Sequence, residues 1–186
     1  MSANIFSTQI EPFKCAEQGF SWSGQLPLSR FARVAHDAIG TIDNQWVQID
    51  CKLSKDAYHR IVWLDARLST EVALQCQRCL DTVAIPLISD VHIAIVDDES
   101  IVDCLDEDAD FIVLGEDLGT QKGDFKTPAT VDLIYILEDE LLLSMPNSPK
   151  HDACEHKHRP AIQTDAEEKR ENPFDILAGL KDKFRS

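Results

Sequence analysis

The sequence predicts an α+β fold: an antiparallel β-sheet meander with one packed helix, a short N-terminal helix, and a C-terminal amphipathic helix after a flexible linker. Three long stretches, 43–54, 60–75 and 82–96, alternate between polar and apolar residues and are separated by short turns. A fourth stretch, 130–143, carries its apolar residues at helical spacing. This combination predicts one antiparallel sheet with a helix that covers one of its faces.

The alternating stretches predict consecutive strands. Residues 46–53 have an apolar side chain at every second position, and the same period continues in 61–74 and 82–96. Because successive side chains of a strand point to opposite faces, this period predicts one buried and one solvated face. The polar residues 54–56 form a turn between the first two strands, and 111–114 is predicted to form a further short strand.

The N-terminal part is less regular. Alternation is confined to the region around Ile5, Phe6 and Ile10, and turns are predicted at Gly19, Gly24 and Pro27. A short helix is predicted in 30–40, and Gly40 could end it. Its apolar residues at helical spacing are Phe31, Val34, Ala35 and Ala38.

The second predicted helix, 130–143, supplies the apolar face that covers the sheet. Its apolar residues on one face are Leu133, Ile134, Leu137 and Leu141. Pro146 helps to stop this helix. A strand over 131–137 is the alternative interpretation. On a helix, the neighbouring acidic side chains of 138–140 would point in different directions and could not converge on one substrate atom. We therefore interpret this run as a solvated face rather than a catalytic carboxylate pair.

The chain is predicted to be a single domain over 1–154, followed by a linker and a helix in 155–186. Residues 157–171 are polar and charged, which is typical of a flexible linker. Asn172 then suits the N-cap position and Pro173 the first helical position. One stripe of the predicted helix consists of Phe174, Leu177, Ala178 and Phe184.

The charge balance bears on the kind of partner. The 186 residues include 18 Lys and Arg against 33 Asp and Glu, which gives a net charge of −15. Proteins that bind nucleic acid through its phosphates usually have the opposite bias, because counterion release requires Lys and Arg. Direct contact with RNA is therefore not expected, unless a local basic patch makes it. A large negative field favours basic proteins instead.

One short region concentrates the acidic residues, with no Lys or Arg among them. It consists of Asp97, Asp98, Glu99, Asp103, Asp106, Glu107, Asp108 and Asp110. One interpretation is a solvated surface loop. The other is a docking face for a basic partner.

Cysteines and a histidine suggest a metal site. Cys76 and Cys79 stand three positions apart in a predicted turn between strands, and His151 and Cys154 have the same spacing. Two such pairs would complete a tetrahedral zinc site of three thiolates and one imidazole. The alternative is that the cysteines are half-buried free thiols at a hairpin turn. A thioredoxin-like function is disfavoured, because the residues after Cys79 resemble a strand rather than a helix.

Other motifs of catalysis or targeting are absent. The sequence contains no Gly-rich phosphate loop, no Gly-x-Ser-x-Gly and no His-Glu-x-x-His. Trp22, Trp46 and Trp63 are predicted to be core residues, since no basic groove accompanies them. The stretch 131–145 is too short and too charged to span a bilayer, and the start lacks a leader pattern, so a cytoplasmic location without membrane contact is expected.

The order of these elements resembles the YceD family, the large ribosomal RNA subunit accumulation proteins. The matching segments are 76–80, the acidic region, 131–133, 138–146, His151, Cys154 and 172–181. The resemblance implies a role in the synthesis, processing or stability of large-subunit ribosomal RNA and establishes no catalytic residues. Some branches of this family carry a second cysteine pair where this chain has His151 and Cys154.

Three functions follow as hypotheses. We favour a non-enzymatic factor that docks on a basic ribosomal or RNA-processing protein, through the acidic region and through Phe174, Leu177 and Phe184 of the C-terminal helix. A metal-dependent RNA-processing hydrolase is the first alternative, although it would need oxygen ligands and a basic substrate path. A purely structural zinc-binding interaction module is the second.

Overall fold

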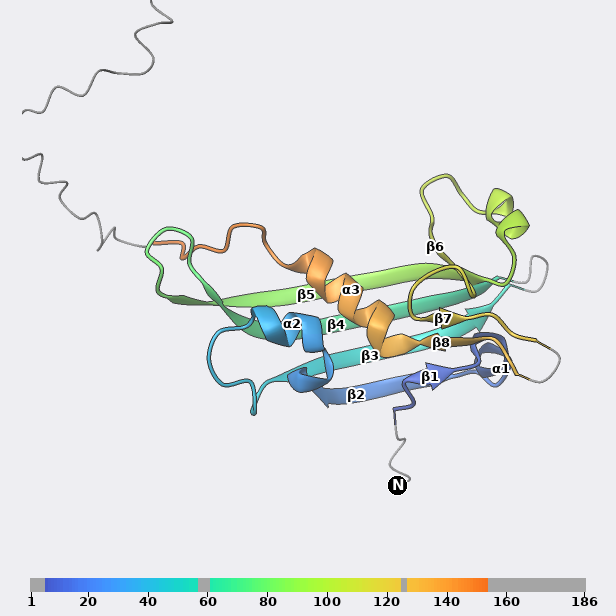
Figure 1. Cartoon of the computed structure of the whole chain (residues 1–186), viewed down its shortest axis with the longest axis horizontal. Helices are drawn as coiled ribbons and strands as arrows, with labels where there is room; N and C mark the ends of the chain where they lie inside the picture. Colours follow the sequence, from blue (N-terminus) through green and yellow to red (C-terminus); the bar gives the residue numbers. More distant parts are fainter. Residues whose placement is uncertain (1–5, 57–60, 125–126, 154–186) are drawn as a thin grey trace, which may run out of the picture. The chain divides into compact units, whose positions relative to one another are not determined.

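A five-stranded β-sheet is the main element of the structure (Figure 1). The computed structural model describes residues 6–56, 61–124 and 127–153. The strands of this sheet are, in order, β2 (Ser21–Pro27), β3 (Trp46–Lys55), β4 (Val62–Gln75), β5 (Thr82–Val96) and β6 (Asp110–Val113). Neighbouring strands are antiparallel from β2 to β5, whereas β6 is parallel to β5. The predicted meander is confirmed in β3, β4 and β5, and the predicted strand at 111–114 in β6.

Strand β2 corrects the prediction of turns at Gly24 and Pro27, because both residues lie within it and pair with β3. The ring of Trp22 occupies the space beside Gly24, where a Cβ atom would lie 2.8 Å from it. Pro27 is the last residue of an edge strand, a position where proline is tolerated. Gly19, with a φ of +69°, does lie in a turn as predicted.

A second, three-stranded sheet was not predicted. It consists of β1 (Gln9–Ile10), β8 (Thr130–Asp132) and β7 (Thr120–Gln121), in the order β1-β8-β7, with antiparallel pairs. Strands of two or three residues are too short to show a period in the sequence. The Leu133 amide donates to the Thr8 carbonyl oxygen at 2.8 Å and extends this pairing. The N-terminal part of the chain is thereby fixed beside residues that follow it by more than a hundred positions.

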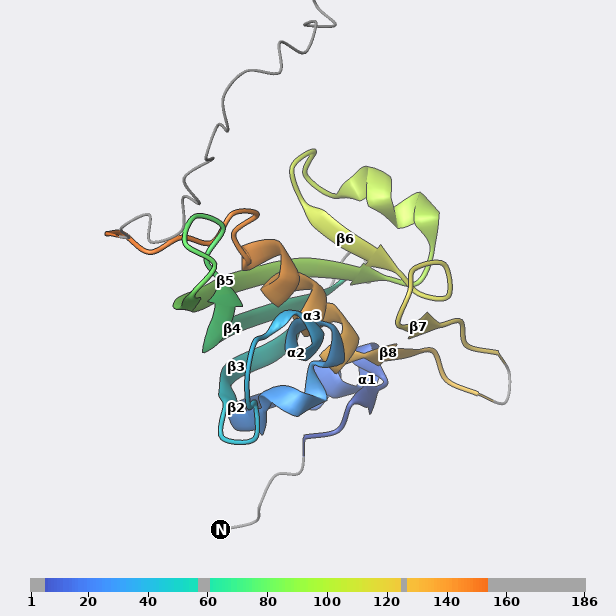
Figure 2. The same ribbon diagram turned by 60° about the vertical axis from the view of Figure 1, so that its left-hand side comes forward.

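Two α-helices, α2 (Ala32–Asp37) and α3 (Leu133–Ser144), lie over the same face of the five-stranded sheet (Figures 1 and 2). The predicted N-terminal helix is confirmed in α2, which is shorter than expected and follows a 3-10 turn, η1 (Leu28–Arg30). A further short helix, α1 (Pro12–Glu17), was not predicted. No helix in the described part of the chain is long and apolar enough to cross a membrane.

Helix α3 begins three residues later than predicted because 130–132 form strand β8. The Asp132 carboxylate caps the helix by accepting the amide hydrogen of Ile134 at 3.0 Å. The four residues predicted to face the sheet, Leu133, Ile134, Leu137 and Leu141, are all buried. Met145 is extended, as expected for a residue before a proline, and ends the helix.

The core lies between the five-stranded sheet and these helices. Residues with no exposed surface there include Val47, Ile49, Leu64, Leu68, Leu133, Leu137 and Leu141. A smaller cluster forms on the opposite face, where the 3-10 helix η2 (Glu99–Cys104) packs. Ile101 and Val102 of η2 contact the cluster that contains Ala94 and Val96 of β5. The predicted acidic loop is therefore held to the sheet by apolar side chains.

The prediction that 138–140 form a solvated face is wrong for Glu138. Its side chain is 7% exposed, and its carboxylate accepts the backbone N–H and the Nε–H of Arg33, each at 2.7 Å. The guanidinium of Arg33 also donates to the Asp139 carboxylate and to the Tyr135 carbonyl oxygen. This ion pair joins α2 to α3. It could not be predicted from the acidic run, because Arg33 lies 105 positions earlier in the chain.

The prediction that all three tryptophans are core residues is wrong for Trp46, which is 51% exposed. Alternation along β3 buries its neighbour Val47 and turns Trp46 to the face of the sheet opposite the helices. Trp63 is half-buried, and its ring stacks on that of His92 with centroids 4.5 Å apart. Trp22, also half-buried, packs edge-on against Phe6.

Replacing Gly119 with alanine is expected to lower the free energy of unfolding by about 2 kcal/mol. Gly119 has a φ of +78°, and a Cβ atom would lie 2.7 Å from the Tyr135 ring. Gly40→Ala is the matched control, since Gly40 has a φ of +87° but nothing within 4 Å of a Cβ atom. The control should lose about 1 kcal/mol through backbone strain alone. Denaturant titrations measure both, and equal losses would show that the Tyr135 contact costs nothing.

Candidate metal centre

The turn between β4 and β5 holds the two cysteines of the Cys-x-x-Cys motif. The Cys76 amide donates to the Asp81 carbonyl oxygen, and the Leu80 amide donates to the Cys76 carbonyl oxygen, both at 2.9 Å. Leu80 has a left-handed φ of 65°, which turns the chain back toward β5. Cys76 has no exposed surface and Cys79 is 5% exposed, so both thiols are more deeply buried than half-buried turn residues would be.

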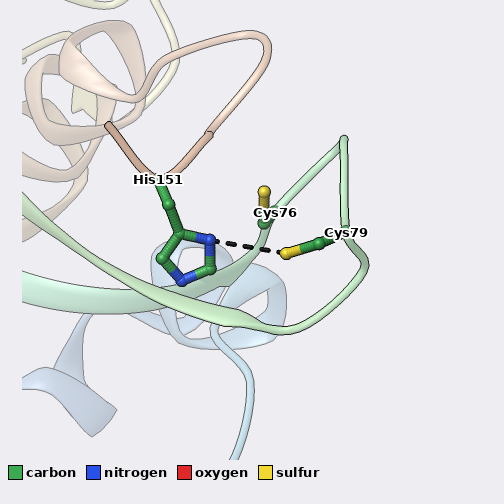
Figure 3. Close-up of side chains that lie close together, drawn as sticks. All are labelled: Cys76, Cys79 and His151. Atoms are coloured by element: carbon green, nitrogen blue, oxygen red, sulfur yellow. Dashed lines mark hydrogen bonds between the residues drawn. The ribbon is translucent and has the colours of Figure 1, made fainter. Parts of the chain in front are cut away.

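The segment after α3 brings His151 to this turn (Figure 3). The Gln77 amide donates to the Pro149 carbonyl oxygen at 2.9 Å and holds the segment there. The Nδ1 atom of His151 lies 3.5 Å from the Cys79 sulfur, and its Nε2 atom lies 3.1 Å from the Thr82 carbonyl oxygen. A carbonyl oxygen only accepts, so Nε2 carries the hydrogen. The lone pair of Nδ1 therefore faces the thiol, ready to ligate a metal.

The same turn favours the thiolate of Cys76. The backbone N–H of Cys79 is the largest cause that lowers the Cys76 pKa to about 5, while burial acts in the opposite direction. The backbone N–H groups of Arg78 and His151 add to the lowering. Hydrogen bonds to a charged form stabilise that form. The thiolate is the form of cysteine that binds metal ions.

Two thiolates and one imidazole are a donor set that suits zinc. The ligand atoms of Cys76, Cys79 and His151 lie within 4.8 Å of one another. Tetrahedral zinc with Zn–S bonds of about 2.3 Å needs donors ~3.8 Å apart, so shifts of roughly 1 Å would close the site. Over the described ranges no other group of three Cys, His, Asp or Glu residues brings its ligand atoms together in this way. The residues fit a zinc ion that takes a fourth ligand from elsewhere.

Three of the four predicted zinc ligands are thus placed together, and metal binding itself stays a prediction. Cys154, the fourth, lies outside the described residues, as do Phe174, Leu177 and Phe184 of the predicted C-terminal helix. The eight predicted acidic partner residues, here called the acidic surface, lie on η2 and its flanks. Asp97 is half-buried, and the exposed members are Asp98, Glu99, Asp103, Asp106, Glu107, Asp108 and Asp110.

Several groups that build the site could not be recognised in the sequence. The carbonyl oxygens of Thr82 and Pro149 orient His151 and its segment, but any residue provides a carbonyl oxygen. Leu80 adopts a left-handed backbone conformation. This conformation usually favours glycine or asparagine, so a leucine at this position did not indicate a tight turn. Only the spacing of the cysteines and of His151 was available to predict the centre.

Fold and site together define the class of protein: an acidic α+β protein with a Cys-x-x-Cys motif in a β-hairpin. This hairpin contacts a histidine in the segment after α3. The sequence profile of the large ribosomal RNA subunit accumulation proteins, YceD, matches residues 64–181. The chain belongs to this family, which confirms the resemblance seen in the sequence. The family is named for an effect on ribosomal RNA and not for a reaction.

A relative supports the same assignment over nearly the whole chain. The large ribosomal RNA subunit accumulation protein YceD of Haemophilus influenzae is 25% identical over 179 residues, which cover 94% of this chain and 95% of that protein. None of the solved structures matches the chain significantly.

Proposed function

We propose that this protein supports the accumulation of large-subunit ribosomal RNA as a non-enzymatic factor that binds a Lys- and Arg-rich protein. Its place in the YceD family supports the ribosomal RNA role. The observation that carries the choice of partner is the acidic surface. Ile101, Val102 and Leu105, which lie among its residues, pack against the sheet and hold its seven exposed acidic residues in a fixed region.

Electrostatics explain why a basic protein is preferred to bare RNA. With a net charge of −15, the chain repels phosphates and releases few counterions on contact with them. The same field accelerates the approach of a basic protein and loses strength as salt rises. A ribosomal protein or an RNA-processing protein with a Lys- and Arg-rich surface has the required chemistry.

The metal centre has a structural part in this proposal. When bound, zinc would tie the segment around His151 to the β4–β5 turn through Cys76 and Cys79. Both thiols are buried, which restricts the access of a substrate to the metal. That burial favours a structural site over the hydrolase alternative. Cleavage of ribosomal RNA precursor by the zinc-loaded protein would overturn this choice.

Neutralising part of the acidic surface is expected to slow partner binding. In the variant Asp103→Asn, Asp106→Asn and Asp108→Asn, the association rate with a basic ribosomal protein should fall about tenfold at low salt and less at physiological salt. Stopped-flow or surface-based kinetics measure this rate.

The control neutralises three exposed acidic residues elsewhere, in the variant Asp37→Asn, Asp43→Asn and Glu71→Gln. It has the same net charge as the first variant. Equal slowing in both variants would assign the effect to net charge alone. Tight binding of bare RNA at physiological salt would contradict the proposed kind of partner.

A further inference from the structure

A groove separates the edge strand β6 from helix α3. Its volume is about 380 Å³, and Ile93 and Ile136 contribute buried apolar side chains to it. Asp110 of β6 and Glu140 of α3 line it from opposite elements. Figure 2 shows β6 at the margin of the five-stranded sheet, beyond β5.

The main chain of β6 offers hydrogen-bonding groups at this margin. The Leu114 amide donates to the Val96 carbonyl oxygen of β5, whereas the Val113 amide donates to the Asp117 carboxylate on the other side. Amides along a strand alternate in direction, so the Phe111 amide and carbonyl point away from β5, as those of Val113 do. An edge with unpaired main-chain groups is a template for an additional strand.

Apolar side chains are exposed beside this edge. Phe111 is 45% exposed and Leu118, in the loop after β6, is 77% exposed, and both line the groove. Exposed aromatic and aliphatic residues next to an open strand are characteristic of surfaces that bind an extended peptide.

Two carboxylates that line the groove, those of Asp110 and Glu140, lack a cationic partner among the described residues. Neither Asp110 nor Glu140 forms an ion pair with any residue that the structure describes, and no Lys or Arg lines the groove. Burial is the largest cause that raises the pKa of Glu140, and the charges of Asp110 and Asp139 raise it further. Asp139 is already engaged by Arg33. A cation placed between Asp110 and Glu140 would relieve their repulsion.

We infer that this groove binds an extended segment of the basic partner, which pairs with the main chain at Phe111 and places a Lys or Arg side chain between Asp110 and Glu140. The inference rests on the proposed function and names the site of the contact. The acidic surface then steers the partner, whereas the groove holds it. A second copy of the chain is a poor occupant, because its charge of −15 is repelled.

Titration of a fluorescent peptide of alternating Lys and Val, followed by anisotropy, tests the inference. The variant Asp110→Asn with Glu140→Gln should weaken binding about tenfold, mainly through faster dissociation, since charges within a contact act on the dissociation rate. The control, Asp43→Asn with Glu71→Gln, removes the same charge outside the groove and should leave dissociation unchanged. The amide resonance of Phe111 should shift on peptide binding in the wild-type protein.

Each other outcome is decisive. Equal weakening in both variants, or shifts confined to other regions, would overturn the groove while leaving the basic partner in place. Failure of every Lys-rich peptide and basic ribosomal protein to bind would instead overturn the proposed function. Displacement of the peptide by an RNA oligonucleotide, or a dimer that the groove variant abolishes, would assign the groove to a different occupant. Denaturant titration should find both variants at least as stable as the wild type.

Discussion

Replacing Cys79 with serine is expected to remove zinc from the protein and with it most of the stability that zinc confers. Cys79 supplies one of the two described thiols, and its sulfur lies 3.5 Å from Nδ1 of His151, so its loss removes one of the three donors that the structure brings together. Zinc at about a thousand times its dissociation constant stabilises a native protein by about 4 kcal/mol. The wild type should gain about that much on zinc addition, and Cys79→Ser less than about 1 kcal/mol.

Elemental analysis of protein made without a polyhistidine tag, together with denaturant titration with and without zinc, measures both effects. Cys104→Ser is the matched control, because Cys104 is an exposed cysteine on η2 that lies outside the cluster. His151→Ala should lose zinc as well, since it deletes the Nδ1 ligand. Zinc retained by Cys79→Ser, or no zinc-dependent stability in the wild type, would return these residues to free thiols at a hairpin.

Replacing Arg33 with alanine is expected to lower the free energy of unfolding by about 3 kcal/mol, the lower end of the range for breaking a buried ion pair. The Glu138 side chain is 7% exposed and would lose its charged partner, whereas Arg33 is 38% exposed, which moderates the cost. Helices α2 and α3 would also lose their main polar connection, including the bond to the Tyr135 carbonyl oxygen.

A double-mutant cycle isolates the pair. Adding Glu138→Ala to Arg33→Ala should cost little more than the single change, because the buried charge is then gone as well. Lys14→Ala provides the comparison with an exposed pair, in which Lys14 and Glu11 lie 3.2 Å apart, and it should cost less than about 1 kcal/mol. Additive losses in the cycle, or a loss in Lys14→Ala as large as in Arg33→Ala, would contradict a special role for this pair.

The parts of the fold that could be predicted are those with a long, regular pattern. Strands β3, β4 and β5 have between 10 and 15 residues each, enough for a period of two to be recognised. Helix α3 likewise presents several turns of apolar residues. Strand β2 was missed because Gly24 and Pro27 usually mark turns, and only the packed ring of Trp22 explains a glycine there. The sequence pattern of β2 does not show that the ring of Trp22 packs over Gly24 of the same strand.

The candidate site shows the same division between local and distant information. The spacing of Cys76 and Cys79 predicted a pair on one turn, because residues that close in sequence must be close in space. His151 was proposed by its chemistry alone, and its arrival depends on hydrogen bonds to carbonyl oxygens that any sequence provides. Glu138 was misjudged for a related reason: its burial depends on Arg33, which no short window of sequence includes.

The pairing of β1 with β8 has a consequence for how the protein forms during translation. Ile10 is opposite Val131, a separation of 131 − 10 = 121 positions. At synthesis rates of about 5–20 residues per second, the ribosome needs roughly 6 to 24 s to make the second partner after the first. The hairpins of β3, β4 and β5 can form in that interval, since each strand follows its partner closely. Strand β1 must wait, with Ile10 still unpaired with β8, and it is during this interval that a nascent chain most needs protection from aggregation.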